Sequence, residues 1–181
     1  MNQIELRHAI NEAVAEGQSL RTQFYESLVE PDKQALGKPA SGTDIAQIEA
    51  LLGAPLPPSF RTFLELFNGW KMFDPAVDLY SAEEILEKAS SAKLAAWRKI
   101  ACEVEGVDAQ TWLLIGGSDF AAAKYFLTPT QVSPDGEMAV IDHDKTVEGE
   151  YESFLKLLIE TNDEYRSGIE DLNTGFDFSN I

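Results

Sequence analysis

The sequence predicts an α+β domain, with helices around a single antiparallel sheet and a helical extension at the N-terminus. Two observations support this fold class. Up to Gly106, apolar side chains recur mainly at helical spacing, with Gly and Pro between the periodic segments. After Gly106 the period changes, and short runs rich in aromatic and branched residues alternate with Gly, Pro and Asp. Strands in such close succession favour an antiparallel meander.

The first element predicted is a helix over residues 3–28. Its rough apolar stripe consists of Ile4, Ala9, Val14, Leu20, Phe24 and Leu28, and Gly17 is a weak point within it. Residues 30–43 hold turn residues and little apolar content, which predicts a linker loop. We therefore expect an N-terminal helix and linker over residues 1–42, an α+β domain over residues 43–165, and a C-terminal tail over residues 166–181.

Two further helices are predicted, one that ends at Gly53 and one that begins at Pro58. Gly53 ends a helix that starts near Asp44, with Thr43 or Asp44 as its N-cap. Pro57 enforces an extended step, and Pro58 can open the next helix, where its missing N–H costs nothing. That helix carries an apolar face, and Asn68-Gly69 stops it before Trp70; the face consists of Phe60, Phe63, Leu64 and Phe67.

The remaining elements follow in order. Ser81-Ala82-Glu83-Glu84 is a capping box that starts a helix, which breaks near Ser90-Ser91 and continues to Gly106. The strands are expected at residues 111–115, 124–128 and 137–141, with a turn at residues 133–136. A closing helix runs from Ser153 through Ile159. Beyond Gly168 the signal fades, and Phe176 and Phe178 either dock on the domain or belong to a mobile tail.

This order of motifs resembles the SUKH superfamily, which contains fungal cell-wall assembly regulators and bacterial toxin-immunity proteins. The resemblance rests first on Gly-x-x-Leu-Pro-x-x-aromatic, an apolar helix and Asn-Gly-aromatic, filled here by Gly53, Leu56, Pro57, Phe60, Phe63, Leu64, Asn68, Gly69 and Trp70. Residues 79–85, 112–116 and 138–144 are similar to later strands of the family, so the resemblance spans roughly residues 43–160. One departure is residues 119–123, Asp-Phe-Ala-Ala-Ala, where the family has a glycine-containing turn.

The net charge is −17, and it is distributed unevenly along the 181 residues. Residues 1–90 hold 14 acids and 7 bases, residues 91–134 hold 4 of each, and residues 135–181 hold 13 acids and 3 bases. Such a surface repels phosphate backbones, which argues against direct nucleic-acid binding. Two interpretations stay open: the charge serves solubility, or it attracts a basic protein partner.

The sequence also indicates a compartment. No apolar run approaches the ~20 residues that a membrane span needs, and residues 1–10 lack the pattern of a secretory signal. Cys102 is the single cysteine, so no disulfide can form within the chain. We therefore expect a cytoplasmic protein without membrane contact.

Candidate chemistry is sparse. Asp142, His143 and Asp144 are adjacent, but neighbours in a strand point to opposite faces, and no second ligand cluster accompanies them. They are interpreted as a solvated strand end. Cys102 lies mid-helix and is interpreted as a buried small apolar residue, while Gly116-Gly117-Ser118 is interpreted as a turn. The sequence therefore predicts no catalytic residue, no cofactor and no metal site.

The family resemblance and the acidic charge together imply a non-catalytic protein-binding domain. The expected role is a cytoplasmic immunity protein that neutralises a bacterial toxin domain, plausibly a basic nuclease. The alternatives are a regulatory scaffold of the cell-wall-regulator type and, from a different class, a hydrolytic enzyme. Charge density selects Asp142, Asp144, Glu148 and Glu150 as partner-binding candidates. Trp70 is a further candidate, because an aromatic residue in a loop past a helix end either covers the core or is an exposed interface anchor.

Overall fold

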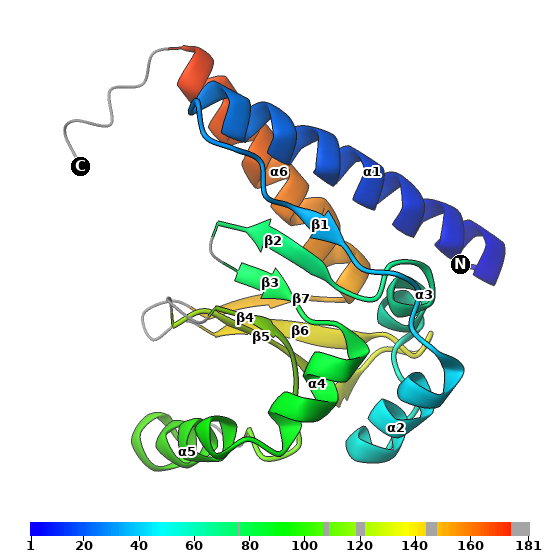
Figure 1. The fold of residues 1–181 in the computed structure, drawn as a ribbon. Helices are drawn as coiled ribbons and strands as arrows, with labels where there is room; N and C mark the ends of the chain where they lie inside the picture. Colours follow the sequence, from blue (N-terminus) through cyan, green and yellow to red (C-terminus); the bar gives the residue numbers. More distant parts are fainter. Residues whose placement is uncertain (76, 107–108, 119–121, 144–147, 175–181) are drawn as a thin grey trace.

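In a computed structural model of the chain, one sheet is covered by helices on both faces (Figure 1). The structure describes residues 1–75, 77–106, 109–118, 122–143 and 148–174. The helices are α1 (Gln3–Ser27), α2 (Gly42–Leu52), α3 (Pro58–Leu66), α4 (Ala82–Ala89), α5 (Ala92–Ile100), which a π-helical turn (Ala101–Glu105) continues, and α6 (Phe154–Asn173). The strands are β1 (Ala35–Leu36), β2 (Trp70–Asp74), β3 (Val77–Leu79), β4 (Leu113–Gly117), β5 (Lys124–Val132), β6 (Met138–His143) and β7 (Glu148–Tyr151).

The sheet is a meander in which the spatial order of the seven strands equals their order in the chain. Every neighbouring pair is antiparallel. The longest ladder joins β5 to β6, from Lys124 opposite His143 to Val132 opposite Met138, with a register shift between Thr128 and Val132. The predicted α+β class with one antiparallel sheet is therefore confirmed. Strands β4, β5 and β6 match the three predicted strands to within a few residues.

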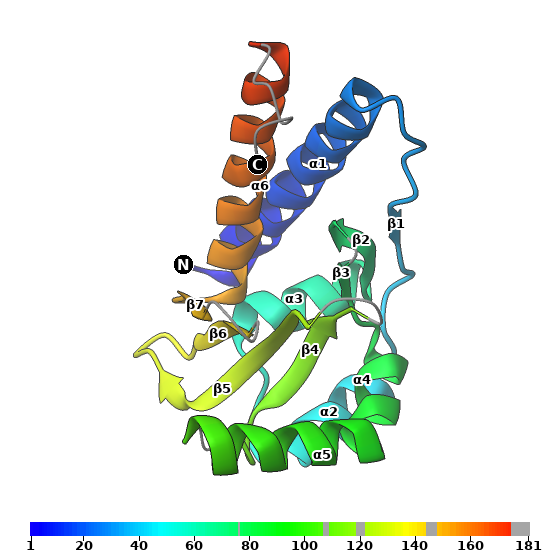
Figure 2. The same cartoon turned by 90° about the vertical axis from the view of Figure 1, so that its left-hand side faces the viewer.

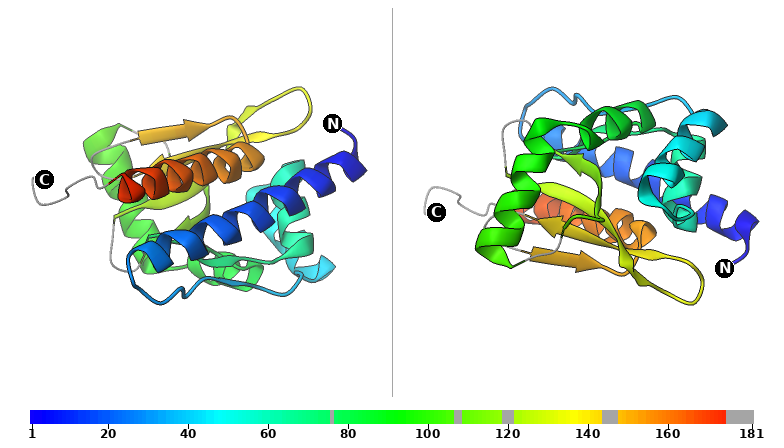
Figure 3. Two further views of the ribbon diagram at one scale, coloured as in Figure 1. Left: turned by 90° about the horizontal axis from the view of Figure 1, so that it is seen from above. Right: turned by 90° about the horizontal axis from the view of Figure 1, so that it is seen from below.

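The helices form two layers. One layer holds α1, α3 and α6, and the other holds α2, α4 and α5 (Figure 2). Helices α1 and α6 run side by side, and their C-terminal ends lie at the same end of the molecule (Figures 1 and 3). Helix α1 contributes Leu6, Ile10, Ala13 and Val14 to the main hydrophobic core. The N-terminal helix is thus packed into the domain rather than held apart from it.

The stretch from Gly53 to Trp70 forms the elements predicted for it. Gly53 caps α2 in the left-handed conformation, with φ of 73°, and Pro58 occupies the first turn of α3. The aromatic face of α3 is core, since Phe60 and Phe63 are fully buried. Asn68 then does more than end the helix: its side-chain oxygen accepts a hydrogen bond of 2.7 Å from the Ala82 amide, at the start of α4.

Several predicted boundaries differ from the structure. The expected linker at residues 30–43 contains β1, which pairs with β2 and could not be recognised alone because it is two residues long. The N-cap of α2 is Ser41, whose hydroxyl accepts from the Asp44 amide, instead of Thr43 or Asp44. Helix α6 continues through Gly168 to Asn173. The predictions for residues 119–121, Phe176 and Phe178 lie outside the described residues.

Candidate functional site

The acidic partner-binding candidates lie on or beside the β6–β7 hairpin, but they do not share one face. Asp142 pairs with Gly149, whereas Glu150 pairs with Ile141. Because side chains alternate along a strand, Asp142 and Glu150 project from opposite faces of the sheet. Glu148 lies opposite His143 in β7. Asp144 is outside the described residues, as is the side chain of Glu148.

The structure instead brings Asp142 together with acids from other elements. Its charge raises the pKa of Asp74 at the end of β2, and the Glu164 carboxylate of α6 raises the same pKa. Glu160, one helical turn before Glu164, raises the pKa of Glu164 in turn. We call these four residues, Asp74, Asp142, Glu160 and Glu164, the acidic cluster.

The acidic cluster is electrostatically unfavourable in the free protein. Burial raises the pKa of Asp74 from 3.8 to about 6, and repulsion by Glu164 and Asp142 adds to the effect of burial. Burial also raises the pKa of Glu164, with Glu160 as the second cause. A pKa raised in this way means that the ionised carboxylate is held at a cost. An added cation would relieve that cost.

One cation, Arg21 of α1, lies near the cluster, but it is engaged elsewhere. Its guanidinium is fully buried, with its carbon 4.4 Å from the centroids of Trp70 and Tyr165. It donates to the carbonyls of Phe73 and Gly17 and to Asn162 Oδ1. Arg21 lowers the pKa of Asp74, yet forms no ion pair with any carboxylate in the described part of the chain. The cluster therefore keeps an excess of negative charge.

Trp70 belongs to the core. It is the first residue of β2 rather than part of a loop, and its side chain is 1% exposed. Its indole N–H donates to Gln34 Oε1 at 3.3 Å, and its ring lies against Arg21. Of the two alternatives for Trp70, core cover is the one that the structure bears out. Its ring therefore does not reach the surface.

Two other polar residues differ from expectation. His143 is 2% exposed and packs edge-on against Trp97, with ring centroids 5.0 Å apart, so it is not at a solvated strand end. Alternation along β6 turns it away from Asp142 towards α5. Cys102, which lies in the π-helical turn, is exposed instead of buried. Among the residues that the structure describes, no group of three or more His, Cys, Asp or Glu could hold a metal ion.

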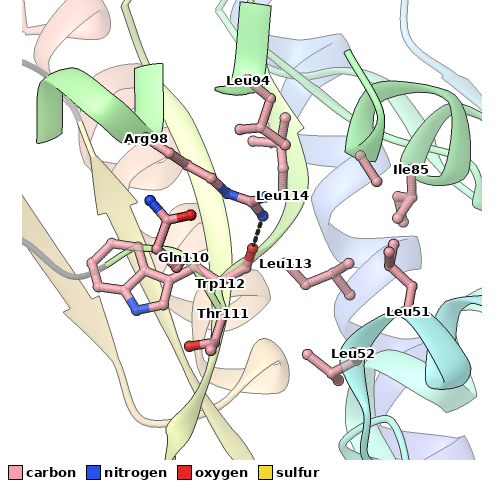
Figure 4. Close-up of a pocket in the computed structure, with 11 residues that line it drawn as sticks. Leu51, Leu52, Ile85, Leu94, Arg98, Gln110, Thr111, Trp112, Leu113 and Leu114 are labelled. Carbon is pink, nitrogen blue, oxygen red and sulfur yellow. Dashed lines mark hydrogen bonds between the residues drawn. The ribbon is translucent and has the colours of Figure 1, made fainter. Parts of the chain in front are cut away.

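A pocket of about 220 Å³ lies on the other side of the sheet, where α2, α4 and α5 meet the start of β4 (Figure 4). Its wall is mainly apolar and includes five leucines, and Arg98 is the one charged side chain among the described residues that line it. Arg98 donates to the carbonyl of Trp112 at 2.7 Å, as Figure 4 shows.

Three members of the acidic cluster were not found from the sequence. Asp74 lies far from Asp142 in the chain, and the meander alone brings β2 and β6 onto one sheet. The sequence did contain a pattern that indicates the other two members. Glu160 and Glu164 are spaced i, i+4 on one helix face, where like charges repel. Such an uncompensated pair is a reason to look for a functional role.

Comparison with known protein families matches residues 39–166 to the SMI1 / KNR4 family (SUKH-1). The chain belongs to this family. The match begins beyond α1 and β1 and covers strands β2 to β7 and most of α6, so every member of the acidic cluster lies within the SUKH-1 segment. No curated protein matches the chain. Among the described residues, none of the helices combines the length and apolarity required to cross a membrane.

Proposed function

We propose that this SUKH-1 protein is a non-catalytic immunity protein, which neutralises a toxin domain by binding a basic surface of it at the acidic cluster. The observation that carries the proposal is that the fold brings together acids from three elements: Asp142 of β6 and Glu164 of α6 lie close enough to Asp74 of β2 to add to the effect of burial on its pKa. Because it is unfavourable to keep these carboxylates ionised in the free protein, the site favours a partner that supplies positive charge. The membership of immunity proteins in the wider family supports the same role.

The mechanism follows from the charge. A Lys or Arg side chain of the partner would lie against Asp74, Asp142 and Glu164 and lower the pKa values of Asp74 and Glu164. If the partner is a nuclease, those same cations contact the phosphates of its substrate, so binding would block its active surface. The protein would act where the toxin acts, in the cytoplasm, which fits a chain with a single cysteine.

The proposal predicts that a toxic module is encoded beside the gene of this protein, and that module provides the test. The module is expressed in a host with and without the chain, and both growth and complex formation are measured. We expect restored growth and a stoichiometric complex. The variant Asp74→Asn/Asp142→Asn/Glu164→Gln removes three charges from the cluster and should weaken the complex by about tenfold or more.

A matched control removes the same charge elsewhere. Glu12, Glu65 and Glu103 each take part in an ion pair with the residue four positions away. Pairs at the surface contribute little to stability. The variant Glu12→Gln/Glu65→Gln/Glu103→Gln should bind like the wild type. Equal weakening by both variants would contradict a localised site, and a module that kills cells despite the chain would contradict the immunity role.

A further inference from the structure

A second pocket, of about 380 Å³, opens on the face of the sheet opposite the acidic cluster. It lies between the α4–α5 junction and strands β4 and β5, and Leu94 of α5 and Leu114 of β4 form part of its apolar floor. Leu114 pairs with Phe126, on which Trp97 of α5 stacks, so this is the α5 side of the sheet. Its volume lies in the range of small-molecule sites, roughly 300–1,000 Å³.

The charge of this pocket is opposite to that of the molecule. Lys88, Lys93 and Lys124 line it, against a single carboxylate, Glu87, among its described lining residues. In a chain with 31 acids and 14 basic residues, three lysines at one cavity are an unusual concentration. Neither Lys88 nor Lys93 forms an ion pair within the described part of the chain. Two ammonium groups are therefore available to a ligand.

The N-terminus of α5 adds to this positive potential. Ser91 caps the helix by accepting from the Leu94 amide at 3.1 Å, and Ser91 also lines the pocket. The first turn of a helix carries partial positive charge and favours anions. Here that turn contains no acidic residue and holds Lys93 instead. A lysine at this position is repelled by the helix dipole and does not stabilise the helix. A bound anion would be attracted by both the lysine and the dipole.

The pocket also offers apolar contact. Leu94, Leu114 and the ring of Tyr80 are nearly fully buried beneath it. Lys88 Nζ lies 4.6 Å from the centroid of Tyr80, which holds this ammonium at the pocket wall. The acidic cluster lies on the opposite face of the sheet, so the charged side chains at this pocket are the three lysines and Glu87.

We infer that this pocket, which we call the lysine pocket, binds a small organic anion: an apolar or aromatic body that carries a phosphate or a carboxylate. The anionic group lies against Lys88, Lys93 and the first turn of α5, and the body of the ligand covers Leu94 and Leu114. This site is separate from the acidic cluster and does not depend on the proposed immunity function.

The experiment titrates the isolated full chain with adenosine monophosphate, phenyl phosphate and phenylacetate, followed by calorimetry and by NMR shifts of the Lys88, Lys93 and Leu114 amides. We expect one-to-one binding of at least one organic anion. A preference for the phosphates or for phenylacetate identifies the anionic group. Adenosine and inorganic phosphate, which each lack one half of the required chemistry, should bind at least tenfold more weakly than the best anion.

The variant Lys88→Gln/Lys93→Gln should weaken that binding by about tenfold or more and leave the melting temperature unchanged, because Lys93 is exposed and Lys88 half-buried. If the double variant loses stability, Lys93→Gln alone carries the test. The control Lys33→Gln/Lys38→Gln makes the same charge change at two exposed residues before α2 and should bind normally. Absence of saturable binding, equal affinity for adenosine, or indifference to the pocket lysines would overturn the inference.

Discussion

At the scale of single residues, Asp74 predicts how stability depends on pH. Its pKa is about 6 in the folded protein against 3.8 ordinarily, so the folded state holds the proton more tightly. The contribution of Asp74 to stability is therefore greatest below about pH 4, falls as the pH rises to about 6, and stays low above that. Asp74→Asn should remove this fall and raise the free energy of unfolding at neutral pH by about 2–3 kcal/mol.

Urea unfolding at about pH 4.5 and about pH 7.5 measures the effect. Glu12→Gln, a change at an exposed carboxylate of α1, should leave the difference between the two pH values as in the wild type. A neutral-pH stability that drops in Asp74→Asn would show that the carboxylate stabilises the fold through Arg21, which is the opposite of what we expect.

Gly17 predicts a second effect at this scale. A Cβ at Gly17 would lie 2.6 Å from Asn162 Oδ1 and 2.8 Å from both Arg21 Nη1 and Trp70 Cη2. Gly17→Ala should therefore cost about 1–3 kcal/mol through overpacking, although alanine favours a helix. Gly42→Ala is the control, because no atom lies within 4 Å of its Cβ position. A Gly17→Ala protein that melts at or above the wild-type temperature would contradict the close packing of α1 on α6.

Local signals in the sequence predicted some residue roles and missed others. The Ser81 capping box forms as expected, since its partners lie within the same turn. Arg21 gave no signal, because its partners are carbonyl groups, rings and an amide from α6 that only the fold brings near. Gly17 looked like a weak point in the helical stripe for the same reason: the side chains that require a glycine there, Asn162 and Trp70, come near it only in the fold. A residue that looks unfavourable for its own element can be required by the neighbouring one.

At the scale of elements, the aromatic face of α3 forms a central part of the hydrophobic core. Phe63 is 0% exposed, and its ring centroid lies 4.9 Å from that of Phe154 in α6. Phe63→Ala should cost about 3–5 kcal/mol, since it removes a buried ring and leaves a cavity. Thermal unfolding compares it with Leu51→Ala, a change at a side chain that is 50% exposed. An unchanged melting temperature for Phe63→Ala would show that this face does not form the core.

Helix α3 also shows why elements are only partly predictable. Pro57 and Pro58 marked its start correctly, yet no side chain of its own caps it. Glu137, which lies just before β6, accepts from the Ser59 amide at 2.9 Å and from its hydroxyl at 2.6 Å. Strands β1, β2 and β7 escaped prediction for a similar reason: they are short, and their pairing depends on partners distant in sequence or beyond a turn.

At the scale of the whole molecule, charge is divided between two faces of one sheet. The count of acids after residue 134 directs attention to the last 47 residues of the chain, whereas the acidic cluster also includes Asp74 from β2. The candidates Asp142 and Glu150 were close in sequence and yet face opposite sides, because strand alternation separates them. The net charge predicts the sign of the charge on a partner, whereas the topology of the sheet decides which carboxylates lie near one another.

The most direct measurement is the rate of association with the toxic module that the proposal predicts beside the gene, recorded by stopped flow at low and high salt. Complementary surfaces predict a fall of about tenfold or more as salt rises, with dissociation much less affected. Asp74→Asn/Asp142→Asn/Glu164→Gln should reproduce that fall at low salt, and Glu12→Gln/Glu65→Gln/Glu103→Gln should not. An association rate indifferent to salt and to the acidic cluster, or a partner that is itself acidic, would contradict the account.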